Sequence, residues 1–393
     1  MSVIGIVCEF NPFHNGHKYL IDSVKKSPDD IVVAVMSGNF VQRAEPALFP
    51  KEIRIKAALS CGVDIVLELP FLYATASAEI FAENAVRILD AFGCEKIAFG
   101  VENTELSLLE KAVAVICTPE FDEELKNELS KGVSYPAARQ AAFDKYGVEC
   151  DISLPNNILA IEYLKAVKKL DSRLIPTAVN RIGAGYNDDF ALGDFASATH
   201  IRNLIEKGES YQKLVPENTL GIYENAIKSG NSVSRRNYNI AVMSLLRGRL
   251  DHCWSQIANM AEGLDNRIKT AIINCNSLNE IYDSAKTKRF THSRVRRAVL
   301  SAALGVTETD MSIKAPYCRL LGFNTEASEM LGGLAKSSKL PFVTSFSDIL
   351  KADSSDVKRV FEFENKSSNI YNLFLQNTVK ASTEMTYMPI KMN

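Results

Sequence analysis

The first half of the chain alternates between short apolar runs and stretches of helical periodicity. Apolar runs typical of buried strands occupy residues 3–8, 31–36, 64–69, 95–100 and about 173–179. Helical patterns lie near residues 16–26, 51–61 and 75–92, and several more helices are expected in an insertion over about 104–170. Nearly continuous apolar strands that alternate with helices predict an α/β fold, with a parallel sheet covered by helices on both faces.

Beyond residue 205 the strand pattern largely fades. Helical patterns recur at about 217–229, 237–249, 253–260, 264–276, 277–285, 291–303 and 324–335, with a more β-like stretch around 340–346. The final dozen residues look poorly structured. Because a chain of 393 residues normally needs more than one core, we expect two domains. Residues 1–205 would form the α/β domain, and residues 206–393 a mainly helical one.

The net charge of −2 is unevenly divided along the chain. Residues 1–205 carry 20 Lys and Arg against 28 Asp and Glu, whereas residues 206–393 carry 25 against 19. A basic second half suggests a polyanionic partner.

The densest basic run spans residues 286–297 and contains no acidic residue. Arginines beside Ser and Thr hydroxyls suit phosphate oxygens, and Phe290 or His292 could stack on a base. A solvated face is the alternative interpretation. The run predicts contacts with RNA through Lys286, Lys288, Arg289, Arg294, Arg296 and Arg297.

Composition points to a cytoplasmic location without membrane contact. No apolar stretch reaches the roughly 20 residues that cross a bilayer, and no basic-then-apolar leader is visible. The eight cysteines are scattered without a C-x-x-C pair, as expected for reduced thiols.

The turn after the first strand carries the most distinctive chemistry. His14 and His17 flank Gly16 and are two of only five histidines in the chain. A strand that leads through a turn into a helix is a usual phosphate-binding arrangement, because free N–H groups and the helix dipole face the anion. Imidazoles can add donors that follow charge onto a phosphate in its transition state. The motif predicts nucleotide handling. A metal site is disfavoured because no nearby Cys or His completes a ligand set.

Other cations lie close to predicted strand ends. Lys51 and Arg54 share one face of a helix, where they can reach a triphosphate or form a solvated surface. Residues 181–188 form a glycine-containing loop that begins with Arg181. In residues 196–202, Ser197 or Thr199 can cap a helix, and Arg202 lies on the same turn as Thr199.

Together these segments resemble one enzyme family. The His-x-Gly-His motif and the Thr-His-Ile-Arg turn resemble the nucleotidyltransferase superfamily that includes nicotinamide-mononucleotide and phosphopantetheine adenylyltransferases. Longer strings resemble the bacterial tRNA(Met) cytidine acetate ligases over nearly the whole chain; they occupy residues 5–17, 36–43, 154–159, 197–202 and 287–290. Family members tend to have Gly at position 44, where this chain has Ala, and His at position 187, where it has Asn.

The resemblance implies a Rossmann-like nucleotidyltransferase core and a helical, basic tRNA-binding domain. It also implies an activity: ATP, with Mg²⁺, would activate acetate, and the acetyl group would pass to the wobble cytidine of elongator tRNA(Met). Catalytic roles on the phosphates would fall to His14, His17 and Arg202, with Lys51 or Arg54. The implied ATP contacts are Val7, Cys8, Glu9, Phe10, Asn11, Pro12, Phe13, His14, Asn15, Gly16, His17, Lys18, Tyr19, Leu20, Gly100, Asn156 or Asn157, Arg181, Ser197 and Thr199.

Two other functions stay open at this point. A small-molecule adenylyltransferase would share the first-half motifs but leave the run at 286–297 without a task. A nucleotide-regulated RNA-binding protein would use both halves without catalysis.

Overall fold

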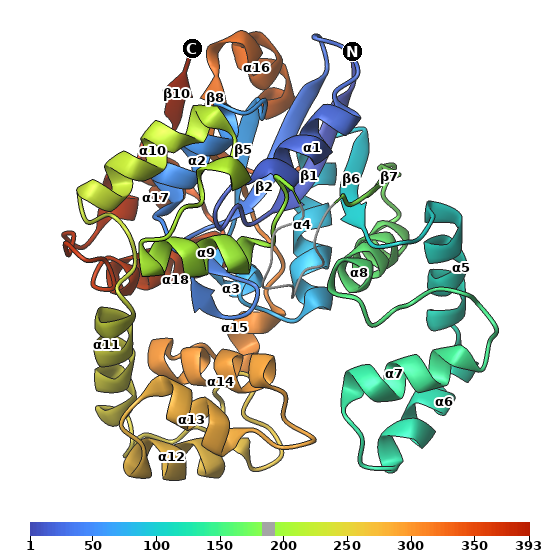
Figure 1. Ribbon diagram of the computed structural model, residues 1–393, viewed down its shortest axis with the longest axis vertical. Helices are drawn as coiled ribbons and strands as arrows, with labels where there is room; N and C mark the ends of the chain where they lie inside the picture. The colour runs from blue at the N-terminus through green and yellow to red at the C-terminus, as the bar shows by residue number, and fades with distance from the viewer. Residues whose placement is uncertain (183–192) are drawn as a thin grey trace.

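The computed structural model describes residues 1–182 and 193–393, which build an eight-stranded sheet flanked by helices (Figure 1). The strand order along the main path is β10-β8-β5-β2-β1-β6-β7, in which β8 spans Cys318–Asn324 and β10 spans Ile390–Met392. Five of these strands are parallel: β1 (Val3–Cys8), β2 (Ile31–Ser37), β5 (Ile65–Leu69), β6 (Lys96–Val101) and β7 (Ile175–Asn180). The order reverses at β1, between β2 and β6, and ligands of such sheets bind beyond the carboxyl ends of the strands at this point.

Alternate residues of the central strands pack on opposite faces of the sheet, as the apolar runs predict. On β2, Val33 and Val35 join one core cluster, whereas Val32 and Ala34 join the other. Helices α4 (Ala78–Phe92) and α8 (Pro155–Lys169) cover the first face, and α1 (Asn15–Val24), α2 (Lys51–Leu59) and α10 (Glu217–Lys228) cover the second. The expectation of a sheet covered on both sides is confirmed.

The expected insertion between the last two parallel strands is also present. It contains α5 (Leu106–Ile116), α6 (Pro119–Ser130) and α7 (Tyr135–Asp144) ahead of α8. Short elements elsewhere in the first half are β3 (Phe40–Val41), β4 (Glu45–Pro46), α3 (Phe71–Ala74) and α9 (Ala198–Lys207).

A second helical group lies below the sheet in Figure 1, at the same end of the molecule as α6 and α7. It consists of α11 (Arg235–Arg247), α12 (Leu264–Asn274), α13 (Leu278–Ala285) and α14 (His292–Leu304), followed by α15 (Glu308–Ser312). Within the described ranges 1–182 and 193–393, no helix has the length and apolar character needed to cross a membrane.

The sheet crosses the boundary that we predicted at residue 205. Strand β8 (Cys318–Asn324) pairs antiparallel with β5, and β9 (Phe342–Val343) and β10 (Ile390–Met392) pair parallel with β8. The helices α16 (Ser328–Ser337), α17 (Phe346–Lys351) and α18 (Ser355–Tyr371) and the short η3 (Thr383–Thr386) accompany these strands. The C-terminal part of the chain therefore completes the first core, and the expectation of a poorly structured tail is wrong.

Candidate active site

A cavity of about 830 Å³ opens at the carboxyl ends of the central strands, where the topology predicts a ligand site. Its wall includes Cys8 at the end of β1, Gly100 on β6 and Asn180 at the end of β7. Helices from both halves of the sequence complete it, with Tyr135 on α7 and Arg297 on α14.

The two motif histidines form the N-terminal cap of α1. His14 precedes the helix, and its Nδ1 accepts a hydrogen bond of 3.0 Å from the backbone N–H of Gly16. The Nδ1 of His17 accepts one of 3.2 Å from the N–H of His14, and the two rings stack with centroids 3.7 Å apart. A Cβ on Gly16 would lie 2.9 Å from the His14 ring, so this position needs glycine. The helix begins at Asn15, slightly earlier than its pattern suggests.

These contacts fix the chemical form of both imidazoles. Burial, followed by repulsion from His17 and Arg181, lowers the pKa of His14 well below its usual range. Burial together with the positive charge of Arg181 lowers the pKa of His17 to about 3. Both rings are therefore neutral near pH 7. Because each Nδ1 accepts a backbone N–H, the single ring proton is assigned to Nε2. The pair offers two neutral hydrogen-bond donors and no free basic nitrogen.

The lowered pKa values predict how the first reaction step responds to pH. For ATP consumption, kcat/KM reports on the free enzyme, and histidines of ordinary pKa would produce a limb near about pH 6.5. Since burial keeps both rings neutral down to much lower pH, we expect no such limb between about pH 6 and 8. A rate profile of the acetate-dependent ATP consumption that the sequence resemblance implies checks this. A histidine-type limb that disappears in His17→Gln would contradict the assignment.

Arg202 lies on α9 beside the histidine turn, as the motif predicts. Its guanidinium donates to the carbonyl oxygen of Asn11 at 2.7 Å and to the Thr199 hydroxyl at 3.0 Å. The Ser197 hydroxyl caps α9 by accepting the N–H of His200. The cavity wall includes Ser197 and Arg202 but not Thr199.

The predicted contacts of Gly100, Arg181 and the Asn-Asn turn meet at a second part of the wall. A Cβ on Gly100 would lie 3.2 Å from Cγ of Arg181, and both residues line the cavity. Of the two alternative asparagines only Asn156 lines it. Asn157 is 0 % exposed and hydrogen-bonds the backbone of Glu102 and Asp151, so it holds the turn. Residues 183–192, which include most of the glycine-containing loop, lie outside the described ranges.

Only some residues of the expected ATP-binding stretch over residues 7–20 line the cavity, and the others lie outside its wall. The wall contains Val7, Cys8, Glu9, Phe10, Asn11, His14, Gly16, His17, Tyr19 and Leu20. Phe13 is fully buried in the core, Lys18 pairs with Asp22, and Asn15 donates to backbone oxygens of Asp194 and Lys213. These three residues and Pro12 shape the turn from outside the cavity wall.

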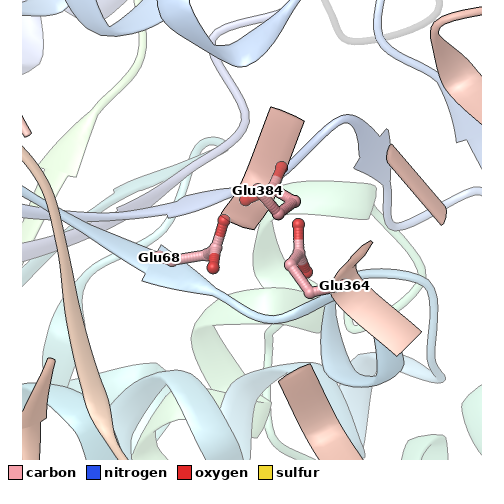
Figure 2. A group of neighbouring side chains, drawn as sticks. All are labelled: Glu68, Glu364 and Glu384. Carbon is pink, nitrogen blue, oxygen red and sulfur yellow. The ribbon is translucent and has the colours of Figure 1, made fainter. Parts of the chain in front are cut away.

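The expectation that Lys51 reaches a phosphate is wrong. Its side chain is 0 % exposed, and its Nζ lies 2.6 Å from Glu68, 2.7 Å from Glu384 and 3.6 Å from Glu364. Figure 2 shows these three carboxylates turned toward one another. Arg319 on β8 also pairs with Glu68 and Glu384, at 2.8 and 2.7 Å. We call Lys51, Glu68, Arg319, Glu364 and Glu384 the buried ion cluster.

Arg54, the alternative partner for the triphosphate, is buried as well. Its guanidinium donates to the carbonyl oxygens of Glu9, Ser37, Gly38 and Phe49. It therefore supports the backbone beneath the cavity and does not line it. A helix pattern with two cations on one face cannot distinguish this role from phosphate binding.

The basic run at 286–297 has acidic partners that its local sequence does not show. Arg289 and Arg294 both pair with Glu262, at 2.7 and 3.2 Å. Arg296 pairs with Glu45 at 2.7 Å. The lack of acidic residues within the run therefore does not leave its arginines without acidic partners, because these partners come from distant segments.

Individual members of this run have different positions. Phe290 is only 7 % exposed, so it belongs to the core and cannot stack on a base; Arg294 lies over its ring. Lys286 and Lys288 are exposed. Thr291, Ser293 and Arg297 line the cavity. Sequence reasoning named Arg297 as an RNA contact but missed that this helix reaches the cavity, because periodicity does not show which helix packs beside the strand ends. Burial and the charge of Arg294 lower the pKa of Arg297 to about 10, which leaves it protonated near pH 7.

The parallel sheet, the histidine-capped helix and the cavity at the strand ends define a nucleotidyltransferase. The sequence profile of the family described as HIGH Nucleotidyl Transferase matches residues 1–386. Two proteins named tRNA(Met) cytidine acetate ligase, from Acetivibrio thermocellus and Caldanaerobacter subterraneus subsp. tengcongensis, are each 38 % identical to this chain. The alignments cover 98 % and 100 % of this chain and 99 % and 100 % of the relatives. The chain belongs to the tRNA(Met) cytidine acetate ligase family.

Solved structures agree with this assignment. The apo form of Thermotoga maritima TmcAL superposes with a TM-score of 0.93, and the form bound with alpha-thio ATP with a TM-score of 0.90. Both are 32 % identical in sequence, and both matches cover 100 % of each chain. The expected fold class is therefore confirmed.

Proposed function

We propose that this protein uses ATP to activate acetate as acetyl-adenylate and transfers the acetyl group to N4 of the wobble cytidine of elongator tRNA(Met). The products are N4-acetylcytidine, AMP and pyrophosphate. The observation that carries the proposal is that one cavity joins the neutral histidine pair and Arg202 to Thr291, Ser293 and Arg297 of the basic helix α14. Relatives named for this activity match the full length of the chain. An enzyme that modifies tRNA would work in the cytoplasm.

In the first step an acetate oxygen attacks the α-phosphorus of ATP, and pyrophosphate leaves. The Nε2–H groups of His14 and His17 would donate to the α-phosphate oxygens as charge develops there. Loss of one such preorganised donor typically costs on the order of 3 kcal/mol of activation energy. Arg202 and Arg181 are the arginines of this wall that we assign to the β- and γ-phosphates, in place of Lys51 and Arg54.

We expect Mg²⁺ to be bound to the triphosphate of ATP when ATP enters the site. The one three-ligand carboxylate group among residues 1–182 and 193–393 is Glu68, Glu364 and Glu384. Lys51 and Arg319 already neutralise this group within the core, so it does not fit a cation on ATP. We therefore assign no protein ligand to Mg²⁺ and no step to it.

In the second step cytosine N4 attacks the activated carbonyl carbon, and AMP leaves. The anticodon loop is single-stranded, so its bases can be turned out into a pocket without opening a duplex. Arg297 and the N-terminal hydroxyls of α14 would hold the RNA backbone at the cavity, and the exposed Lys286 and Lys288 would extend the contact.

Exchange of labelled pyrophosphate into ATP tests the proposed activation. With purified protein we expect exchange that requires acetate and does not require tRNA. Exchange that requires a nucleotide monophosphate substrate in place of acetate would identify a small-molecule adenylyltransferase. Exchange with neither would leave only a binding protein, and either result would contradict the proposal.

The double substitution Arg294→Glu with Arg297→Glu tests the assignment of α14 to RNA. Reversing the charge of Arg297 on the cavity wall and that of Arg294 on the same helix should lower tRNA acetylation by roughly tenfold or more at low salt, and the difference from the wild type should shrink as salt rises because the variant makes fewer phosphate contacts. Pyrophosphate exchange should fall far less, because the ATP contacts come from other elements. Lys336→Glu, on exposed α16 at the opposite end of the molecule, is the matched control (Figure 1). Equal losses of exchange and acetylation in a folded double variant would contradict this division of roles.

A further inference from the structure

The acetyl transfer releases a proton from cytosine N4, and the cavity wall contains few groups able to accept it. Its described carboxylates are Glu9, Glu45, Glu79 and Glu162. Three of them already face cations. Glu45 pairs with Arg296 at 2.7 Å, Glu162 with Arg139 and Lys165 at 2.9 and 2.8 Å, and Glu79 with Lys165 at 3.8 Å.

Glu9 differs from the other three carboxylates. It directly follows β1, next to the turn that carries the histidine pair. Its Oε1 accepts the backbone N–H of Gln42 at 2.7 Å. Among residues 1–182 and 193–393, no lysine, arginine or histidine side chain forms an ion pair with it. Its second oxygen therefore keeps its capacity to accept a proton or a hydrogen bond.

The other titratable groups near Glu9 are poor proton acceptors. His14 and His17 use their Nδ1 lone pairs on backbone N–H groups. The Cys8 thiol has a pKa raised by burial and donates to the carbonyl oxygen of Val35. Burial also raises the pKa of the Tyr163 phenol, which stays protonated. Within the described part of the wall, Glu9 is left as the acceptor.

We propose that the Glu9 carboxylate is the general base that takes the N4 proton during acetyl transfer, a role that rests on the proposed function. The bond between N4 and the acetyl carbon forms as the bond between that carbon and the AMP oxygen breaks. AMP leaves with that electron pair. One N4 proton passes to Glu9, which returns it to solvent when the products leave.

The electrostatic surroundings suit this role. Burial raises the pKa of Glu9 above its ordinary range, while the Gln42 N–H and the charges of Arg202, Arg54 and Arg43 oppose the rise. A carboxylate whose pKa is raised above its ordinary value is a stronger base than an exposed one. The surrounding arginines also offset repulsion between this carboxylate and the AMP phosphate.

A purely structural role for Glu9 would use only its bond to Gln42, which holds the β3–β4 segment. Glu9→Gln separates the two roles, because an amide oxygen can still accept the Gln42 N–H but cannot take a proton. We expect the ratio of tRNA acetylation to pyrophosphate exchange to fall by about 10²-fold or more, in the range that general-base catalysis contributes. In the wild type, protonation of Glu9 should slow the transfer as the pH falls, beginning at a higher pH than protonation of an ordinary carboxyl would. This pH dependence of the transfer rate should disappear in Glu9→Gln.

Glu52→Gln is the matched control, because burial also raises the pKa of Glu52 and the cavity wall does not include it. Transfer by Glu9→Gln at the wild-type rate and with the wild-type pH profile would overturn the role of Glu9, as would equal losses of transfer and exchange. Absence of acetate-dependent exchange in the wild-type protein would instead contradict the proposed function itself.

Discussion

His17→Ala should lower acetate-dependent exchange of pyrophosphate into ATP by about 10²- to 10³-fold, the usual cost of removing one preorganised donor at a developing charge. The imidazole is neutral, its Nδ1 is bound to the backbone N–H of His14, and its Nε2–H is the donor on the cavity wall. A quench assay with labelled pyrophosphate, at saturating ATP and acetate, measures the loss.

This substitution also removes one half of the cap of α1, so stability needs its own control. Loss of a capping interaction costs about 1 kcal/mol. Glutamine is a favoured residue at this position of a capping box, so His17→Gln should keep most of that stability. It should still lose most of the exchange, because its acceptor is engaged with the cap and its amide does not reproduce the imidazole Nε2–H. Exposed His252→Ala controls for loss of a histidine elsewhere. Wild-type exchange by folded His17→Ala would remove this residue from the mechanism.

Lys51→Met should destabilise the protein by about 3–5 kcal/mol, because it leaves buried carboxylates without their compensating charge. Lys51 contacts Glu68 on β5, Glu364 on α18 and Glu384 on η3, so it ties the C-terminal segment to the first core. The shift of the urea unfolding midpoint measures the loss. The remaining activity should follow the folded fraction.

Lys56→Met is the matched control, since Lys56 lies on the same helix and is exposed. It should change the free energy of unfolding by no more than about 0.5 kcal/mol. Adding Glu384→Gln to Lys51→Met should recover part of the stability, because it removes one of the uncompensated charges. If Lys51→Met were as stable as Lys56→Met but lacked exchange, a phosphate role for Lys51 would be restored.

The central sheet and the histidine turn could be predicted because their determinants are local. The continuous apolar runs of β1, β2 and β5 are typical of buried parallel strands, and the strand-turn-helix pattern places His14 and His17 at a strand end. Resemblance added the reaction, since no spacing of residues indicates a cytidine or an acetate.

The remaining features depend on contacts between distant segments. Lys51 and Glu384 are 333 positions apart, so local sequence shows a cation on a helix and cannot show its partner. Strand β8 follows several helices in the chain, and it joins the sheet by pairing with the distant strand β5. The position of Arg297 on the cavity wall likewise depends on how α14 packs, and this contact is set by tertiary structure.

The fate of the acetate oxygens tests the central claim most directly. The protein would be incubated with ATP, tRNA(Met) and acetate labelled with ¹⁸O, and AMP and the tRNA nucleosides would be analysed by mass spectrometry. If acetate attacks the α-phosphorus and N4 then attacks the carbonyl carbon, each N4-acetylcytidine should be accompanied by one AMP carrying a single ¹⁸O. Unlabelled AMP, or N4-acetylcytidine formed without AMP, would contradict an acetyl-adenylate made at the histidine-capped helix.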